Sequence, residues 1–301
     1  MLKRTLFFSS AVSLRLQLSQ LAIHFVEEDR PNQTIPLEDI GIIILEHRQI
    51  QLTHPLLSAC MEHKITVVCC DAKHMPSGVM LPFRGHSEMQ QRQRWQLQAK
   101  EPLRKQLWRQ LVVQKIRNQA AVLEQVGRDG RPLLAMIESV QSGDKTNVEG
   151  HAAALYWREV FADFYPKFVR DRDLAMVNPI LNYGYAVVRA AAARAVVSAG
   201  LLVSYGLFHK NKYNAYALAD DLMEPFRPYM DRLCYDLILE HGEVEIEEVT
   251  LSMKQQIWQL MGSEVQIDGS HSVFQIAMQR SAVSLAHCFA GTQRKLNLPN
   301  L

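Results

Sequence analysis

The sequence lacks the short motifs by which several large enzyme classes bind a nucleotide or present a nucleophile. No G-x-x-x-x-G-K-[ST], G-x-G-x-x-G or G-x-S-x-G segment occurs, so ATP-driven, dinucleotide-dependent and serine-hydrolase chemistries lose support. The five cysteines are odd in number and include no C-x-x-C pair. This pattern favours free thiols in a reducing cytoplasm over a disulfide-stapled scaffold.

Long hydrophobic runs are missing as well. The longest uncharged stretch late in the chain, residues 195–208, falls short of the roughly 20 residues that a membrane-spanning helix needs. The first residues resemble a signal peptide, but their apolar part contains three serines, ends at Arg15 and offers no A-x-A cleavage site. We therefore predict a strand near the N-terminus, no membrane insertion and a cytoplasmic protein.

A strong imbalance of charge is also absent. The 33 Lys and Arg against 31 Asp and Glu give a net charge of +2 over 301 residues. Hydrophobic residues at 48% and charged residues at 21% are ordinary for globular domains, which excludes wholesale disorder and collagen-like or coiled-coil architectures. The length suggests two domains. Any argument for nucleic-acid binding must therefore rest on where the charges lie.

Hydrophobic periodicity changes near residue 80. Between residues 14 and 25 apolar side chains occupy alternate positions, and residues 40–45 and 65–70 are short apolar runs typical of strands, whereas residues 53–62 have helical spacing. Beyond residue 90 the spacing is helical, with helices expected over 148–165, 180–200, 220–239 and 271–290. The sequence thus predicts an α+β protein: a β-rich N-terminal domain over 1–75, a linker over 76–90 and a mostly α-helical domain over 91–301.

Residues 84–131 concentrate positive charge. They include 11 Lys or Arg and 4 Asp or Glu, a local excess of +7 that the near-neutral total hides. Such a stretch is either a solvated helix face or a surface that contacts phosphates, and composition alone leaves both interpretations open. Five glutamates between residues 240 and 248 form a compensating acidic segment.

Three further segments carry side chains suited to a metal ion. Thr146 and Glu149 have the spacing of a capping box, although a helix start also presents its positive end to a bound phosphate. His209 follows an apolar run, where a lone histidine is usually a hydrogen-bonded boundary residue. Asp221 and Glu224 lie on one helical face, as in an acidic first turn. One histidine and two carboxylates suit Mg²⁺ or Mn²⁺, but spacing alone does not bring them together.

Ordered segments along nearly the whole chain carry a family resemblance. They are IPLEDI at 35–40, LTHPLLS at 52–58, CDAKHMPSG at 70–78 with LP at 81–82, KIRNQA at 115–120, NVEG at 147–150, LNYGY at 181–185 and DLMEPFRP at 221–228. Together they resemble the CRISPR-associated integrase family, the metal-dependent proteins that capture new spacers, and specifically its type II branch.

The resemblance implies a fold, an activity and a set of site residues. It implies an N-terminal β-sandwich joined to a helical catalytic domain, with the metal ligands on Glu149, His209 and Glu224 and a supporting acid at Asp221. With Mg²⁺ or Mn²⁺, such a protein joins the 3′-hydroxyl ends of captured DNA to the CRISPR repeat by transesterification and also acts as an endonuclease. The basic residues expected to contact DNA phosphates are Arg84, Arg92, Arg94, Lys115, Arg117, Arg158 and Arg189.

Partners follow from the same resemblance. They are double-stranded DNA, as prespacer and as CRISPR repeat, a second copy of the chain bound through residues 1–75, and a small ferredoxin-like CRISPR-associated protein that completes a heterohexamer in a prokaryotic cytoplasm. Two alternatives stay open. One is a non-catalytic DNA-binding scaffold, and the other is a stand-alone metal-dependent repair nuclease that uses the same residues with water.

Overall fold

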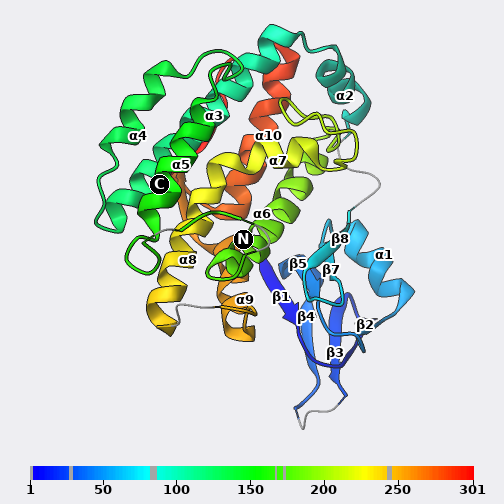
Figure 1. Cartoon of the computed structure of the whole chain (residues 1–301). Helices are drawn as coiled ribbons and strands as arrows, with labels where there is room; N and C mark the ends of the chain where they lie inside the picture. The colour runs from blue at the N-terminus through cyan, green and yellow to red at the C-terminus, as the bar shows by residue number, and fades with distance from the viewer. Residues whose placement is uncertain (1–2, 27–29, 82–86, 167, 172–173, 243–245) are drawn as a thin grey trace.

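The N-terminal part of the chain consists of two four-stranded sheets (Figure 1). The computed structural model describes residues 3–26, 30–81, 87–166, 168–171, 174–242 and 246–301. One sheet has the order β1-β5-β7-β8 and the other β4-β3-β2-β6. Their strands are β1 (Arg4–Phe8), β2 (Val12–Gln17), β3 (Gln20–Phe25), β4 (Gln33–Pro36), β5 (Ile40–Leu45), β6 (Gln51–Leu52), β7 (Thr66–Cys70) and β8 (Pro76–Met80), and they are accompanied by η1 (Leu37–Asp39) and α1 (His54–Glu62).

Strand β5 separates two hydrophobic cores. It is apolar and buried along nearly its whole length, as in a strand covered on both faces. Ile40 and Ile43 pack with residues of both sheets, such as Leu14, whereas Ile42 and Ile44 belong to the core of the helical part. The β-rich part is therefore a sandwich of two sheets, and helices cover the other face of the β5-containing sheet.

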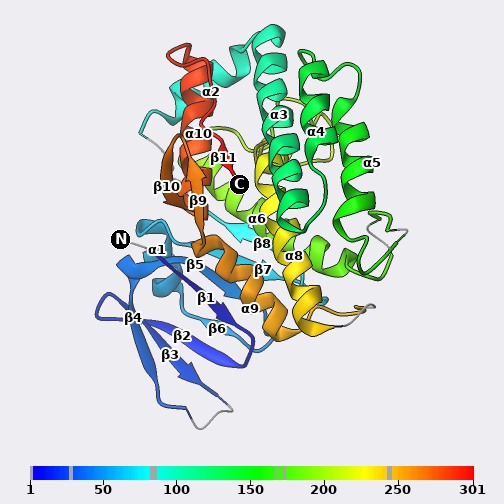
Figure 2. The ribbon, with the colours of Figure 1, turned by 90° about the vertical axis from the view of Figure 1, so that its left-hand side faces the viewer.

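The rest of the described chain is mostly helical (Figures 1 and 2). Its helices are α2 (Met89–Gln98), α3 (Glu101–Gln125), α4 (Arg131–Met136), α5 (Val148–Val160), α6 (Asn178–Ser198), α7 (Ala217–Met223), α8 (Arg227–His241), α9 (Leu251–Gln259) and α10 (Phe274–Ala290), with 3₁₀ turns η2 (Ile137–Ser139), η3 (Glu224–Phe226) and η4 (Leu260–Gly262). A small sheet has the order β10-β9-β11, with β9 (Glu264–Ile267), β10 (Ser270–Val273) and β11 (Pro299–Asn300). The predicted α+β class is confirmed, and among the described helices none is long and apolar enough to cross a bilayer.

Close helix packing fixes the elements that carry the site. Helix α6 approaches α8 so tightly at Gly184 that a Cβ there would lie 2.3 Å from the sulfur of Met230. Asn118 of α3 is fully buried and donates hydrogen bonds to the carbonyls of Pro225 (2.7 Å) and Pro299 (3.0 Å). Helix α3 is thereby tied both to η3 and to the C-terminal strand β11.

Three predicted segments differ from the observed elements. The expected linker 76–90 begins with β8, which pairs antiparallel with β7, and its last two residues belong to α2; residues 82–86 lie outside the described part. Pro76 opens β8, a position where a missing N–H is tolerated. The helix expected over 220–239 is divided by η3, which contains Pro225. The helix expected from 271 begins at Phe274, after β10. Dimerisation through residues 1–75 stays a prediction.

Candidate metal centre

The capping box predicted from Thr146 and Glu149 at the start of α5 does not form. Instead the Asp144 carboxylate accepts hydrogen bonds from the backbone N–H groups of Val148 (2.9 Å) and Glu149 (3.0 Å). The N-cap position falls one residue after Thr146, in the left-handed region (φ 54°), and its side chain makes no capping bond. Asp144 thus caps two of the free N–H groups at the helix start, and the Glu149 carboxylate pairs with Lys115.

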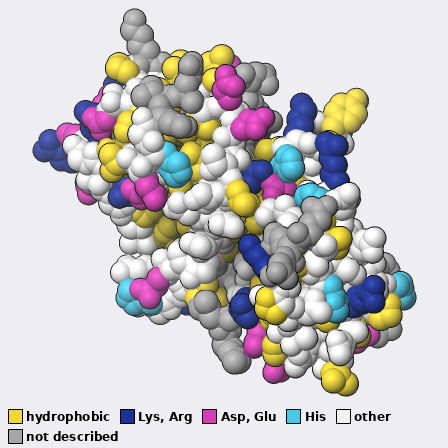
Figure 3. Space-filling model, turned by 90° about the horizontal axis from the view of Figure 1, so that it is seen from below, with side chains coloured by type: hydrophobic (Ala, Val, Ile, Leu, Met, Phe, Trp, Pro, Cys, Tyr) yellow, Lys and Arg dark blue, Asp and Glu magenta, His cyan; other side chains and the backbone are white. Residues whose placement is uncertain are grey.

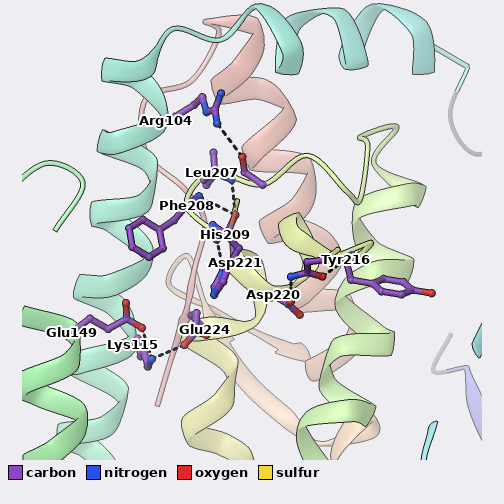
Figure 4. Close-up of polar contacts among 12 residues, drawn as sticks. Arg104, Lys115, Glu149, Leu207, Phe208, His209, Tyr216, Asp220, Asp221 and Glu224 are labelled. Carbon is purple, nitrogen blue, oxygen red and sulfur yellow. Dashed lines mark hydrogen bonds and ion pairs between the residues drawn. The ribbon is translucent and has the colours of Figure 1, made fainter. Parts of the chain in front are cut away.

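Glu224, at the start of η3, is held by two cations. Lys115 of α3 donates to Glu149 Oε1 at 2.5 Å and lies 2.6 Å from Glu224 Oε2, and Arg227 donates to both Glu224 oxygens at 2.9 and 3.2 Å (Figure 4). Burial alone would raise the pKa of Glu224, but Arg227 and Lys115 outweigh it and lower that pKa. Burial would likewise lower the pKa of Lys115, but the Glu224 and Glu149 carboxylates raise it. The Lys115 ammonium and the Glu224 carboxylate are therefore both charged at neutral pH.

His209 lies in the loop between α6 and α7, and this loop folds around Asp221. The Asp221 carboxylate is fully buried, accepts hydrogen bonds from the backbone N–H groups of residues 207–209, and has Oδ1 2.7 Å from His209 Nδ1. The Asp221 hydrogen bond raises the pKa of His209, and burial raises that of Asp221. A Cβ at Gly206 would lie 2.7 Å from both Asp221 Oδ2 and the His209 carbonyl oxygen, so the loop requires glycine there. With Nδ1 on Asp221, His209 Nε2 is left for a ligand.

The three predicted ligands lie in one region but not around one point. Glu149 and Glu224 share the ammonium of Lys115, and His209 and Glu224 line the same cavity, with His209 drawn above the two glutamates in Figure 4. As they stand, no three His, Cys, Asp or Glu side chains in the described part of the chain are grouped closely enough to hold a metal ion. Their chemistry fits a divalent ion, since two carboxylates and an imidazole suit Mg²⁺ or Mn²⁺ and the carboxylates already converge on one cation.

A cavity of about 1040 Å³ opens beside His209 and Glu224. Strand β8 forms one side of it, and α6 with the loop before α7 forms the other. The arginines that line it are Arg170, Arg189 and Arg227. Arg189 lies 2.7 Å from Asp220 and its guanidinium packs over the Tyr216 ring, 5.0 Å from the centroid. A wall of arginines and aromatic rings next to the carboxylates suits a polyanionic chain.

The seven basic residues expected to contact DNA occupy different environments. The exposed ones are Arg94, Arg117 and Arg158. Arg189 lines the cavity, and Arg84 lies outside the described residues. Arg92 and Lys115 are both buried: Arg92 donates to the carbonyl of Ala199 at 3.0 Å, and Lys115 lies between the two glutamates. Contact of these residues with DNA stays a prediction. Composition counts every face of a helix alike, whereas packing turns some of its cations inward.

One face of the molecule, seen from below in Figure 3, can be checked for a basic surface that would suit DNA phosphates. Figure 3 shows acidic and basic side chains interspersed on it, and the side chains coloured there form no continuous basic area. This face therefore offers no continuous basic surface for a polyanion.

Sequence reasoning missed a buried polar group behind Glu224. Asp231, 1% exposed, accepts hydrogen bonds from Tyr156 (3.0 Å) and Tyr185, and the Arg227 guanidinium lies over the Tyr185 ring at 4.2 Å. Burial raises the pKa of Asp231 to about 6, although both tyrosines and Arg227 oppose the shift. Arg227 follows Glu224 by three residues, and this helical spacing could have revealed the ion pair between them. The Asp–Tyr contacts join three helices and leave no local signal.

Comparison with solved structures identifies proteins that share this fold. A casposase bound to an integration product has the same fold, with a TM-score of 0.80 at 22% identity over 98% of this chain and 92% of that one. A chain of a Cas6-RT-Cas1–Cas2 complex has a TM-score of 0.71 at 18% identity, over 98% of this chain and 36% of that longer one.

Sequence comparison is more specific. The chain is 40% identical over 270 residues to the CRISPR-associated endonuclease Cas1 of Neisseria meningitidis serogroup C (strain 8013), covering 89% of this chain and 86% of that protein. The family described as CRISPR associated protein Cas1 matches residues 10–256. The chain therefore belongs to the CRISPR-associated protein Cas1 family, which confirms the resemblance seen in its segments.

Proposed function

We propose that this protein is a divalent-metal-dependent DNA integrase of CRISPR spacer acquisition. It joins the 3′-hydroxyl ends of captured DNA to the CRISPR repeat by transesterification, and it acts as an endonuclease when water takes the place of the hydroxyl. The family and a relative named as a CRISPR-associated endonuclease support the class of activity. The fold shared with a casposase bound to an integration product is the reason to propose joining as well as cutting. The single observation that carries the proposal is the convergence of Glu149 and Glu224 on one cation beside His209.

Glu149, Glu224 and Nε2 of His209 would hold Mg²⁺ or Mn²⁺. When bound, the ion supplies positive charge at the target phosphate and lowers the pKa of the attacking hydroxyl. The chain's own residues prepare the ligands. Asp221 fixes the orientation of the imidazole, and Asp144 fixes the start of the helix from which Glu149 projects.

The lining of the cavity would hold the DNA backbone. Arg189 and Arg227 present guanidinium groups next to the ligands, and phosphate contacts of this kind position DNA without reading its bases. One phosphodiester bond replaces another in transesterification, so the reaction needs no ATP. This agrees with the missing phosphate-binding motif.

The proposed partners are those implied by the family. They are double-stranded DNA as prespacer and repeat, a second copy of the chain bound through residues 1–75, and a small ferredoxin-like protein that completes a heterohexamer in the prokaryotic cytoplasm. The chain shares its fold with part of a Cas6-RT-Cas1–Cas2 complex, which supports a partner of the Cas2 kind.

The experiment that tests the proposal is half-site integration. The purified protein and its small partner are incubated with a labelled duplex bearing 3′-hydroxyl ends and a supercoiled plasmid that carries a CRISPR repeat, with Mn²⁺ or Mg²⁺. We expect the label to appear in relaxed plasmid, and chelation or Glu149→Gln to reduce it by at least about a hundredfold. Relaxation without label transfer would instead identify a hydrolytic nuclease, and DNA binding without strand chemistry would identify a scaffold. Full activity of a folded Glu149→Gln protein would exclude the metal role.

A further inference from the structure

Lys115 occupies an unusual position for a residue of a basic stretch. Its side chain is only 8% exposed, and its ammonium nitrogen lies 2.5 Å from Glu149 Oε1 and 2.6 Å from Glu224 Oε2. It comes from the middle of α3, whereas the two glutamates come from α5 and η3. A single side chain therefore bridges two segments that are 75 residues apart in the sequence.

The two carboxylates differ in how much they depend on this cation. Glu224 also receives two hydrogen bonds from Arg227, so it keeps a positive partner when Lys115 is removed. Among the described contacts, by contrast, the Glu149 carboxylate pairs with one basic side chain, that of Lys115. Two carboxylates that face the same point repel each other unless a cation lies between them. The Lys115 ammonium lies between Glu149 and Glu224 and thus holds the pair together.

A divalent ion and this ammonium cannot occupy the site together. Mg²⁺ binds carboxylate oxygens at about 2.0 to 2.1 Å, so an ion shared by Glu149 and Glu224 would lie close to the present position of the Lys115 nitrogen. A monovalent and a divalent cation at such a short separation repel each other strongly in a buried site. The flexible four-carbon stem of lysine allows the ammonium to withdraw while α3 stays in place.

We propose that Lys115 is a built-in counter-ion of the metal centre, which holds Glu149 and Glu224 in position and leaves the place between them when a divalent ion binds. This inference rests on the proposed metal site. It makes Lys115 a positioning residue whose charge competes with the metal. The binding of Mg²⁺ or Mn²⁺ then includes the cost of displacing an internal cation, so removal of the charge strengthens metal binding even though it removes a buried ion pair.

The test measures Mn²⁺ binding without DNA, through the electron paramagnetic resonance signal of the free ion. The proteins compared are unmodified protein, Lys115→Met, Lys115→Arg, Lys105→Met and Glu149→Gln. We expect Lys115→Met to lower the Mn²⁺ dissociation constant by roughly tenfold or more, because one charge repulsion is removed. Lys115→Arg keeps the charge and should bind no more tightly than unmodified protein. Lys105 pairs with Glu101 at 2.7 Å on the same helix, away from the site, so Lys105→Met is the matched control and should leave binding unchanged.

Thermal unfolding gives a second readout that does not depend on activity. Without metal, Lys115→Met should unfold at a lower temperature than unmodified protein, and saturating Mn²⁺ should raise its midpoint by more than it raises that of unmodified protein. If Lys115→Met does not fold, Lys115→Gln removes the charge while keeping a hydrogen-bond donor, and the same comparison applies to it.

The outcomes separate this inference from the proposed function. Mn²⁺ binding that is lost in Glu149→Gln but is equal or weaker in the neutral Lys115 variants would overturn the inference and keep the metal site. Tighter binding in Lys115→Arg, which retains the charge, would also overturn it. Absence of Glu149-dependent Mn²⁺ binding in every variant would overturn the proposed metal site itself.

Discussion

The two halves of the molecule treat buried polarity in opposite ways. Among the described residues fifteen polar or charged side chains are buried, and thirteen of them lie in the helical part. The two-sheet part contributes only Glu46 and Thr66. Burying a charge is costly unless it is paired. The helical half buries Lys115, Glu224 and Asp231 at and behind the proposed metal site, whereas the sandwich is organised around apolar packing.

One of the two buried polar side chains of the sandwich, Glu46, lies at its boundary with the helical part. Glu46 follows β5 and pairs with Lys254 of α9, and one of its oxygens lies 3.4 Å from His74 Nδ1. Its carboxylate therefore belongs to the boundary between the halves and not to the core of the sandwich. The groups of the proposed metal site all lie in the helical part.

Among the substitutions that test this contrast between the two halves, Ile43→Ala is expected to have the largest effect on stability. Ile43 is fully buried in the core shared by the two sheets, and its truncation should lower the free energy of unfolding by about 2 to 5 kcal/mol. Urea unfolding measures the change. Ile276→Ala on α10, where the side chain is 48% exposed, is the control and should change stability by less than about 0.5 kcal/mol.

Metal binding adds a second measurement for the same variant. Folded Ile43→Ala protein should bind Mn²⁺ as unmodified protein does, because the substitution touches no ligand. A weakened Mn²⁺ site in the folded variant would show that the halves are coupled and would break the division of roles.

A smaller effect, confined to the helical part, is expected from Asp231→Asn. Burial raises the pKa of Asp231 to about 6, against about 3.9 in an unfolded chain. Between these values the folded state binds more protons than the unfolded state, so this group makes the protein less stable as pH rises from 4 to 6. Relative to Asp231→Asn, unmodified protein should lose about 2 to 3 kcal/mol of stability across that window.

Urea unfolding at several pH values measures this difference. The carboxylate accepts from Tyr156 with one oxygen and from Tyr185 with the other, whereas asparagine offers a single acceptor oxygen. The two proteins will therefore differ at every pH, and only the change of that difference with pH is informative. Parallel curves would mean that Asp231 titrates normally in the folded protein and that burial in this half costs less than the contrast assumes.

Sequence patterns predicted the elements whose signal is periodic and long. The alternation over residues 14–25, the apolar run of β5 and the helical spacing beyond residue 90 all correspond to observed elements. Short elements escaped, namely α4, α9 and the small sheet of β9 to β11, because two to nine residues carry little periodicity. Strand β8 was mistaken for a linker because Pro76 and Gly78 are breakers in most contexts.

The site could be predicted only in part. Glu149, His209, Asp221 and Glu224 were found through segments that resemble a family, while local spacing alone allowed an ordinary structural role for each. The contact of Asp221 with His209 agrees with the supporting role expected for it, and ligation by the other three stays a prediction. The burial of Lys115 could not be predicted, because a sequence gives the charge of a side chain but not the direction in which packing turns it.

The smallest effects concern the start of α5, where sequence and structure name different capping residues. Asp144→Ala removes the acceptor of two backbone N–H groups and should lower the free energy of unfolding by about 1 to 2 kcal/mol. Thr146→Ala should change it by less than about 0.5 kcal/mol, since no capping bond from Thr146 exists to be lost. The order of the two effects in urea unfolding decides the question. If Thr146→Ala were the more damaging, the capping box would form in solution, Glu149 would turn back to its own helix, and the carboxylate pair around Lys115 would be undone. If Asp144→Ala also weakens Mn²⁺ binding while Thr146→Ala does not, the loop before α5 positions Glu149 as well as stabilising the helix. A buried polar residue of a loop, Asp144, would then also serve the proposed metal site.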